Sequence, residues 1–242
     1  MLEHDPARAV NDDGGVINLV PILLQAAGGD PHLVLAGQPG QEVGIFARDG
    51  QGIPAFGAIA KQRGIKVIIS SVRRDAVDAT THEIKSLNYL NSVLAKLEAA
   101  DAGADDALML DRNGFVSEAT TTNLFIVKHG EIFTPPSTAG ILPGVTRKRI
   151  IKLARELDYR VIEKGLTPYD VTNADEAFLT GTLSEVVPLV KVRGIEIADG
   201  KVGPITQIVL EGFVKVRADP ANGLPVYQEA ERIVARRQSP RQ

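Results

Sequence analysis

Four short segments of the sequence combine reactive or polar side chains with apolar neighbours. Residues 84–91 contain Lys85 and Tyr89, and residues 114–125 contain Glu118. Residues 142–147 read Leu-Pro-Gly-Val-Thr-Arg, and residues 176–186 include Thr-Gly-Thr. A lysine amine can form a Schiff base with a carbonyl compound where burial or a nearby charge keeps it neutral. A glycine and a threonine at the start of a helix can bind a phosphate group. These residue types point to carbonyl chemistry beside an anion site.

Each segment also has an ordinary structural interpretation when it is taken alone. Lys85 is then a solvated lysine at the start of a helix, and Tyr89 is a core tyrosine with a satisfied hydroxyl. Glu118 is a surface carboxylate on a hairpin, which is the commoner position of glutamate on a strand. Residues 142–146 form a simple helix cap, and residues 180–182 form a β-bulge without a ligand.

Taken together and in this order, the four segments resemble the class IV (fold-type IV) pyridoxal-phosphate aminotransferases. That family includes branched-chain amino acid aminotransferases, D-amino acid aminotransferases and aminodeoxychorismate lyases. The resemblance covers residues 64–213, and Tyr89 and the 176–182 segment favour the branched-chain type.

The resemblance implies a role for each segment. Lys85 holds pyridoxal 5'-phosphate as an internal aldimine and moves the proton between the substrate and the cofactor, and Tyr89 hydrogen-bonds the ring hydroxyl. Glu118 pairs with the ring nitrogen, which has to stay protonated if the cofactor is to act as an electron sink. Thr182 contacts the phosphate, and the Thr182–Leu183 backbone faces the substrate carboxylate. The remaining residues implied to hold the phosphate or the ring are Leu142, Gly144, Val145 and Thr146.

The composition excludes several other classes of function. The 242 residues carry 27 Lys+Arg against 30 Asp+Glu, so the chain has no basic surface for nucleic acid or for an anionic membrane. Cysteine is absent, which excludes disulfides, thiolate metal sites and a cysteine nucleophile. Four scattered histidines and no H-E-x-x-H segment argue against a metal site, and no Walker loop is present. No apolar window is long enough for a membrane span, and the polar start differs from a signal peptide, so we expect a cytoplasmic protein.

Hydrophobic patterning from Gly64 onward predicts an α+β fold, with a hairpin-rich sheet and a few helices packed on it. Residues 107–134 are typical of an antiparallel meander, with Asn113-Gly114 as a hairpin turn. Strands are expected at 65–69, 107–110, 115–119, 123–127, 132–134, 160–163, 177–180 and 186–192. Helices are expected from near Lys85 to Leu97, at 145–157, after a Thr167 cap and at 205–216.

The amino-terminal part differs in quality, because glycine and proline break it into short apolar runs at 16–24, 33–35 and 43–46. We therefore predict two domains. Residues 1–63 form a small amino-terminal α/β domain that is shortened relative to the family, and residues 64–242 form the larger cofactor-binding domain. The polar tail from Glu229 is predicted to be a frayed helix.

The stretch before the lysine in the family carries an arginine that clamps the cofactor phosphate and aromatic residues that line the substrate pocket. Arg8 and Arg48 are the only arginines before Arg63, and neither lies in the family context. Loss of one charge-assisted contact weakens phosphate binding by about 1.5–3 kcal/mol.

The sequence thus predicts transamination of a branched-chain L-amino acid with 2-oxoglutarate, in a homodimer whose sites are assembled between two subunits. D-amino acid transamination and aminodeoxychorismate lyase activity are alternatives within the same family. A third alternative is a truncated member that folds and binds the cofactor but is catalytically impaired, because the small domain forms one wall of the pocket.

Overall fold

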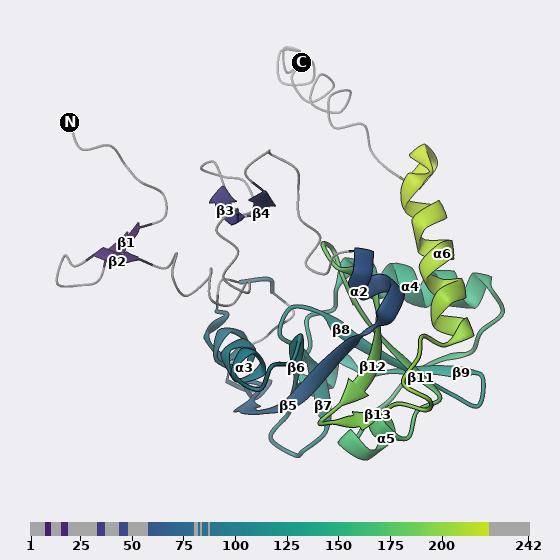
Figure 1. Ribbon diagram of the computed structural model, residues 1–242, viewed down its shortest axis with the longest axis horizontal. Coiled ribbons are helices and arrows are strands. Elements are labelled where there is room, and N and C mark those ends of the chain that lie inside the picture. The colour runs from purple at the N-terminus through teal and green to yellow at the C-terminus, as the bar shows by residue number, and fades with distance from the viewer. Residues whose placement is uncertain are drawn as a thin grey trace, which may run out of the picture.

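The computed structural model describes residues 58–79, 82, 84–86 and 88–222, and the backbone of four short strands nearer the amino terminus (Figure 1). These strands form two antiparallel pairs, and the last three overlap the apolar runs at 16–24, 33–35 and 43–46. The predicted domain division at Gly64 stays a prediction, and the helix predicted from Glu229 lies outside the described residues. The four strands are β1 (Arg8–Val10), β2 (Val16–Asn18), β3 (Leu33–Ala36) and β4 (Gly44–Ala47).

A nine-stranded mixed sheet forms the body of the described part, in the order β10-β9-β8-β11-β12-β5-β6-β7, with β13 beside β12. Strand β5 lies between β12 and β6 and runs parallel to both. The strands are β5 (Ile65–Arg73), β6 (Asp106–Leu110), β7 (Val116–Ala119), β8 (Asn123–Lys128), β9 (Glu131–Thr134), β10 (Val161–Glu163), β11 (Glu176–Gly181), β12 (Glu185–Val192) and β13 (Ile195–Glu196).

The central strands are buried on both faces, and their alternate residues belong to different cores. In β8, Leu124 and Ile126 pack in a core that collects residues from β5, β6, β7, β11 and β12, so the sheet curves around it. Phe125 and Val127 of the same strand pack on the outer face, against helices. Because successive side chains of a strand point to opposite faces, such strands appear in the sequence as continuous apolar runs. The strands predicted from these runs are present.

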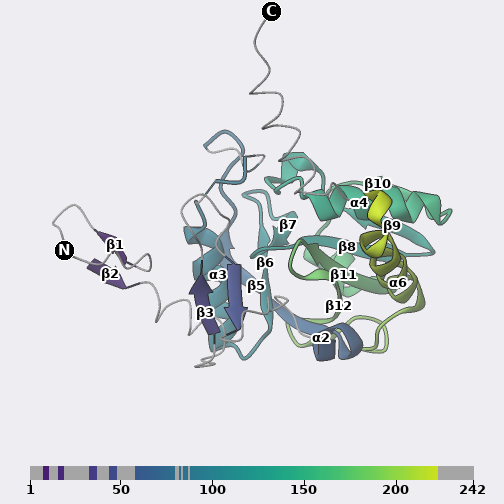
Figure 2. The same cartoon turned by 90° about the horizontal axis from the view of Figure 1, so that it is seen from above.

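Helices cover the outer faces of the sheet on two sides (Figure 2). Helix α3 (Leu90–Asp101) lies against β5 and β6 through Ala95 and Ala99. Helices α4 (Val145–Glu156) and α6 (Pro204–Ala218) pack on β8 and β11, where Phe125 and Phe178 stack with ring centroids 5.0 Å apart. The short helices are α2 (Ala58–Arg63), α5 (Pro168–Thr172), η1 (Ser137–Ala139) and η2 (Pro220–Asn222).

The cap predicted for α5 is confirmed. The Thr167 hydroxyl accepts a hydrogen bond from the Asp170 N–H, and the Asp170 carboxylate accepts one from the Thr167 N–H. This reciprocal arrangement satisfies two donors that the first turn of a helix leaves without partners, and it depends only on residues three apart in the sequence.

Two predicted features of the fold are wrong. The helix expected to begin near Lys85 begins at Leu90, because turns occupy the preceding residues: the Ser86 N–H donates to the Ile84 carbonyl at 2.8 Å, and the Asn88 N–H donates to Ser86 Oγ at 3.4 Å. Residues 107–134 do not form one meander either. Strand β7 pairs with β6, whereas β8 pairs with β9 and β11, so the 120–122 turn carries the chain across to another part of the sheet.

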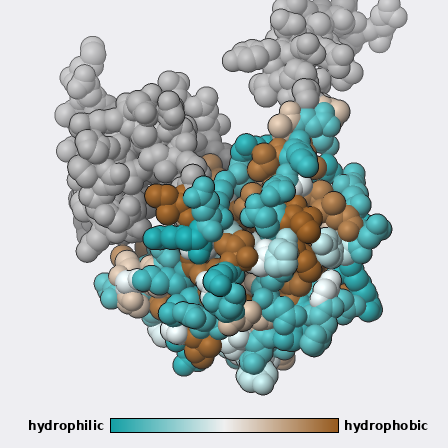
Figure 3. Space-filling model, turned by 45° about the vertical axis from the view of Figure 1, so that its right-hand side comes forward, coloured by the Kyte–Doolittle hydropathy of each residue, from teal (hydrophilic) through white to brown (hydrophobic). Residues whose placement is uncertain are grey.

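On the face shown in Figure 3, hydrophilic residues dominate the coloured part of the surface, with apolar residues between them. The largest fully buried side chains include Phe125, Phe178 and Ile132, which pack in the core between the sheet and its helices. Among the described residues, no helix has both the length and the apolar character that crossing a membrane requires.

Candidate active site

Glu118 lies on β7 and is a deeply buried carboxylate, with only 5% of the residue exposed. Its Oε1 atom pairs with Arg74 Nη2 at 2.6 Å, and Oε2 accepts hydrogen bonds from Asn123 Nδ2 at 2.9 Å and from the Leu142 N–H at 3.1 Å. Burial raises the pKa of Glu118 to about 7, although the Arg74 charge opposes that rise. The interpretation of Glu118 as a surface carboxylate is therefore excluded.

Lys85 and Tyr89 meet in the loop before α3, where Lys85 Nζ donates a hydrogen bond to the Tyr89 hydroxyl at 2.9 Å. Neither residue lies inside a helix: Tyr89 is the N-cap of α3, and Lys85 precedes it in the chain. The described residues leave the Lys85 side chain exposed. Its charge nevertheless acts on Glu118 and helps to lower the pKa of that carboxyl. The loop thus brings the lysine near the buried carboxylate.

The segment before α4 is tied to the same carboxylate. The Leu142 N–H donates to Glu118, and the Leu142 carbonyl accepts a hydrogen bond from Asn123 Nδ2 at 2.9 Å. Gly144 is the N-cap of α4 and approaches Asn123 so closely that a Cβ atom there would lie 2.5 Å from Asn123 Oδ1. Asn123 therefore joins the start of α4 to the Glu118 site.

The first turn of α4 has the arrangement of an anion site. Gly144 has no side chain to cap the leading N–H groups, and the positive end of the helix dipole lies there. The Val145 side chain is 81% exposed, whereas Thr146 is buried at the same turn. The prediction that residues 142–146 lead directly into a helix is confirmed, because α4 starts at Val145.

Thr182 and Leu183 lie in the exposed turn between β11 and β12. Thr180 is the register partner of Asn123 across β11 and β8, so the turn lies just past the amino-terminal end of β8. A Cβ atom on Gly181 would lie 3.0 Å from Thr122 Cγ2, which confirms how closely this turn approaches the 120–122 turn. The predicted strand break at 181–182 is therefore present, and it is at the same end of β8 as Asn123.

Buried hydroxyl groups border this turn. Thr122 and Thr180 are 3% and 0% exposed, and within the described residues neither hydroxyl has a hydrogen-bond partner. Buried polar groups are usually paired in native proteins, so hydroxyls of this kind are suited to meet a ligand or water. Thr180 directly precedes Gly181, and Thr122 approaches Gly181 from the 120–122 turn.

Glu185 fixes the far side of the same turn. Its backbone adopts a positive φ of 58°, which is uncommon for a residue with a side chain. Its carboxylate pairs with Lys61 of α2 at 2.5 Å and with Arg217 of α6. These two ion pairs connect the turn to two helices and hold its backbone in place.

Sequence reasoning missed Arg74 and Asn123, although both contact Glu118 directly. The signal for Arg74 is the polar run Arg73-Arg74-Asp75 where the apolar strand β5 ends. Asn123 belongs to one of the four segments, but nothing in its spacing from Glu118 indicates that its amide spans the gap to Leu142.

The close approach at Gly144 gives a first test of the site's packing. We expect Gly144→Ala to lower the free energy of unfolding by about 1–3 kcal/mol, because the new methyl group would displace Asn123 and its hydrogen bonds to Glu118 and Leu142. Denaturant unfolding measures this change. The control is Gly212→Ala in α6, where the methyl group meets only the flexible end of Leu153. Equal effects of the two substitutions would contradict a special role for Gly144.

Comparisons with known proteins connect this geometry to a family. A model of the family described as Amino-transferase class IV matches residues 52–192, which is more than half of the chain and includes the candidate site from Arg74 to Glu185. The branched-chain-amino-acid aminotransferase of Pseudomonas aeruginosa is 46% identical over 159 residues, 65% of this chain and 52% of that protein. The chain thus spans about half the length of the curated relatives it matches.

Two solved structures share the fold. The Escherichia coli branched-chain amino acid aminotransferase has a TM-score of 0.68 and 34% identity, covering 79% of this chain and 63% of that one. The branched-chain amino acid aminotransferase from Thermobaculum terrenum, solved in its PLP-form, has a TM-score of 0.66 and 35% identity, covering 71% of this chain and 57% of that one. The family match, these likenesses and the arrangement around Glu118 agree: the chain belongs to the class IV aminotransferases and has their fold-type IV architecture.

Proposed function

We propose that this chain is a pyridoxal-phosphate-dependent aminotransferase that transfers the amino group of a branched-chain L-amino acid to 2-oxoglutarate. Relatives with 42–46% identity are branched-chain-amino-acid aminotransferases. Solved structures of similar fold contain a phosphopyridoxyl-glutamate or pyridoxamine 5'-phosphate. The single observation that carries the proposal is Glu118, a buried carboxylate held on both oxygens near the Lys85–Tyr89 pair.

The residues present fit the cofactor's chemical groups. An amine, a phenol and a buried carboxylate suit its aldehyde, its ring hydroxyl and its ring nitrogen. The start of α4 offers N–H groups for its phosphate, and the buried hydroxyls of Thr122 and Thr180 lie at the same end of β8. When bound, the cofactor supplies an electron sink that weakens the bonds at the substrate's Cα.

Lys85 Nζ is the atom to which the cofactor is attached in this proposal, and it is also the base that moves the proton at the substrate's Cα. Its contact with the Tyr89 hydroxyl supports this role, because the phenol orients the amine toward the ring. Tyr89 then donates to or accepts from the ring hydroxyl.

Glu118 holds the proton on the ring nitrogen. A carboxylate can do this only while it is ionised, and burial alone works against ionisation. The hydrogen bonds from Asn123 and Leu142 and the ion pair with Arg74 favour the charged form. A positively charged ring nitrogen would favour it further.

Phosphate binding is assigned to two segments that meet near Asn123. Gly144 lets the backbone approach closely, and Val145 and Thr146 provide N–H groups and a hydroxyl at the positive end of α4. Thr182 adds a hydroxyl from the β11–β12 turn, and the Thr182–Leu183 backbone faces the substrate carboxylate. Leu142 contacts the ring face.

The test is a spectroscopic panel on the full chain loaded with pyridoxal phosphate. We expect the absorbance band of the lysine-bound cofactor to form and then to disappear on addition of L-Leu, L-Ile or L-Val. It should return on addition of 2-oxoglutarate. L-Glu should also discharge it, because glutamate is the amino form of the second substrate.

Each other outcome identifies a different function. Response to D-Ala and not to the L-amino acids would replace the proposal by D-amino acid transamination, and pyruvate release from aminodeoxychorismate would replace it by the lyase activity. Cofactor binding with no response to any amino acid would identify an impaired member. No binding would overturn the cofactor assignment. The homodimeric assembly and the cytoplasmic location stay predictions from the sequence.

A further inference from the structure

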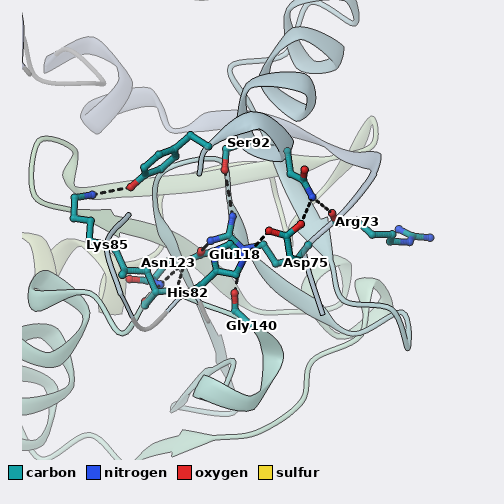
Figure 4. A network of polar contacts seen from close by, with 12 residues as sticks. Arg73, Asp75, His82, Lys85, Ser92, Glu118, Asn123 and Gly140 are labelled. Carbon is teal, nitrogen blue, oxygen red and sulfur yellow. Dashed lines mark hydrogen bonds and ion pairs between the residues drawn. The ribbon is translucent and has the colours of Figure 1, made fainter. Parts of the chain in front are cut away.

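Arg74 is a buried arginine that directly follows β5, with 7% of the residue exposed. Each of its three guanidinium nitrogens has a partner from a different part of the chain. Nη2 pairs with Glu118 at 2.6 Å, Nη1 donates to Ser92 Oγ at 3.2 Å, and Nε donates to the Gly140 carbonyl at 3.0 Å. Figure 4 shows these three partners, Ser92, Glu118 and Gly140, lying close together.

These contacts define what Arg74 can do. Its three nitrogens are all engaged within the protein, so it is not positioned to act as an arginine clamp for the cofactor phosphate. Ser92 of α3 and the Gly140 backbone fix the guanidinium plane and aim one N–H edge at Glu118 Oε1. Gly140 adopts a φ of 73°, and a Cβ there would lie 3.4 Å from Arg74 Cγ, so this turn fits closely against the arginine stem.

Among the described residues, other charged groups also act on Glu118, but none contacts it as Arg74 does. Lys85 is exposed, and Arg147 donates to the Pro135 carbonyl and pairs with Glu163 at 2.6 Å. Both lower the pKa of Glu118 less than Arg74 does. His82 lies beside Arg74, pairs with Asp75 at 3.1 Å, and has its pKa lowered by burial and by the Arg74 charge, which favours its neutral form.

We propose that Arg74 is a positioning residue that acts through Glu118, keeping this carboxylate ionised and turned so that it can hold the proton on the cofactor's ring nitrogen. Arg74 itself touches neither the cofactor nor the substrate. The part that concerns the ring nitrogen rests on the proposed function, whereas the effect on Glu118 can be measured without any cofactor.

A lysine should replace Arg74 only in part. Lysine retains the positive charge, but its ammonium group is a point charge and cannot reach Glu118, Ser92 and Gly140 with three fixed donors. Arg74→Lys should therefore keep much of the effect on the ionisation of Glu118 and lose part of its orientation. Arg74→Gln should lose both.

The first experiment uses the full chain before cofactor is added. Infrared difference spectra between the wild type and Glu118→Gln isolate the carbonyl band of the protonated Glu118 carboxyl, so His82 and the other titrating groups cancel. Its midpoint should lie at about pH 7 in the wild type. The difference between Arg74→Gln and the double variant Arg74→Gln/Glu118→Gln gives the same band without the arginine. Its midpoint should be higher by about 1–3 pH units, because a neighbouring cation lowers the pKa of a carboxyl group by about that much. Arg74→Lys should lie between the two.

The matched control is Arg147→Gln. Arg147 is also a deeply buried, hydrogen-bonded arginine, but its contacts are with Thr134, Pro135 and Glu163 and not with Glu118. Its removal should move the Glu118 midpoint by much less than the removal of Arg74. Equal shifts for the two variants, or no shift for Arg74→Gln, would overturn the proposal.

The second experiment is a double-substitution cycle on the cofactor-loaded protein. Arg74→Gln should lower kcat about 10- to 100-fold with little change in KM, and Arg74→Lys should recover part of the loss. In the Glu118→Gln background, the same Arg74 substitution should have almost no further effect on kcat. A purely structural role would lower stability and kcat equally in both backgrounds, and that result would contradict the proposal.

The two experiments separate the two possible failures. If the wild type binds no pyridoxal phosphate, the proposed function fails while the infrared titration still tests the hold of Arg74 on Glu118. If the cofactor binds and the enzyme transaminates, but the pH midpoint of Glu118 is the same with and without Arg74, the proposed function stands and the role of Arg74 is wrong.

Discussion

The Lys85→Ala variant should lose transamination by about 10⁴-fold or more, because the proposed function gives this one amine two roles, as the attachment point for the cofactor and as the base at the substrate's Cα. Lys85 is exposed and its side chain contacts Tyr89 at the surface, so the fold should remain intact. The absorbance band of the lysine-bound cofactor should be absent. Rates of amino-group transfer in the two half-reactions measure the loss.

A matched control and a rescue sharpen this test. Lys148 is an exposed lysine on α4, and Lys148→Ala should leave the absorbance band and the turnover unchanged. Added methylamine should restore part of the proton transfer in Lys85→Ala, since a small amine can enter the space that the side chain leaves. Retention of more than about a tenth of the wild-type rate in Lys85→Ala would rule out the assigned role.

Glu118→Gln should lower kcat by about 10²–10³-fold, the range expected when one preorganised electrostatic contact to a developing charge is lost. The amide has nearly the same shape as the carboxyl and can still accept a hydrogen bond from Arg74, but it cannot keep the ring nitrogen protonated. The affinity for pyridoxal phosphate should fall as well, which equilibrium dialysis measures. The kcat of Glu118→Asp should lie between those of the wild type and Glu118→Gln, because aspartate keeps the negative charge but has a shorter side chain.

Glu163→Gln is the matched control, since Glu163 also pairs with a buried arginine, Arg147, at 2.6 Å. That variant should keep its kcat. A pH series adds a second readout on the cofactor-free chain. The folded-state pKa of Glu118 is raised, to about 7 against 4.5, so its protonation stabilises the fold below pH 4.5. That stability, about 3 kcal/mol, is lost as the pH rises through 7. The stability of Glu118→Gln should not fall in this way as the pH rises through 7. An identical pH dependence of stability in both proteins would contradict the prediction.

Much of the fold is predictable from the sequence because its determinants are local. Strands buried on both faces, such as β8, appear as unbroken apolar runs. The Thr167–Asp170 cap depends only on two residues three apart in the sequence. Pro204 is the first residue of α6, a position where the missing N–H of proline breaks no helical hydrogen bond. What could not be predicted is which strands become neighbours. The 120–122 turn carries the chain away from β7, and no residue in it indicates the new partner.

The candidate site divides in the same way. Glu118 and the start of α4 were identified from their own segments, and the structure places them together. Arg74 could not be identified as their partner, because its contact with Glu118 depends on how β5, β6 and β7 align. The wrong helix start at Lys85 has a local cause: the apolar spacing of α3 continues backwards into residues 85–89, where turns replace it.

The central place of β5 has a consequence for folding on the ribosome. One edge of β5 pairs with β6, which is synthesised soon afterwards, but the other edge waits for β12, roughly 120 residues later. Until then, an apolar strand has an unpaired edge, and such edges promote aggregation between nascent chains. The two halves of the sheet can therefore join only after β12 is made, and a ribosome that pauses before residue 185 leaves them apart. Conditions that slow synthesis of this chain should therefore increase the fraction that is insoluble. The activity of the molecules that do fold should not change.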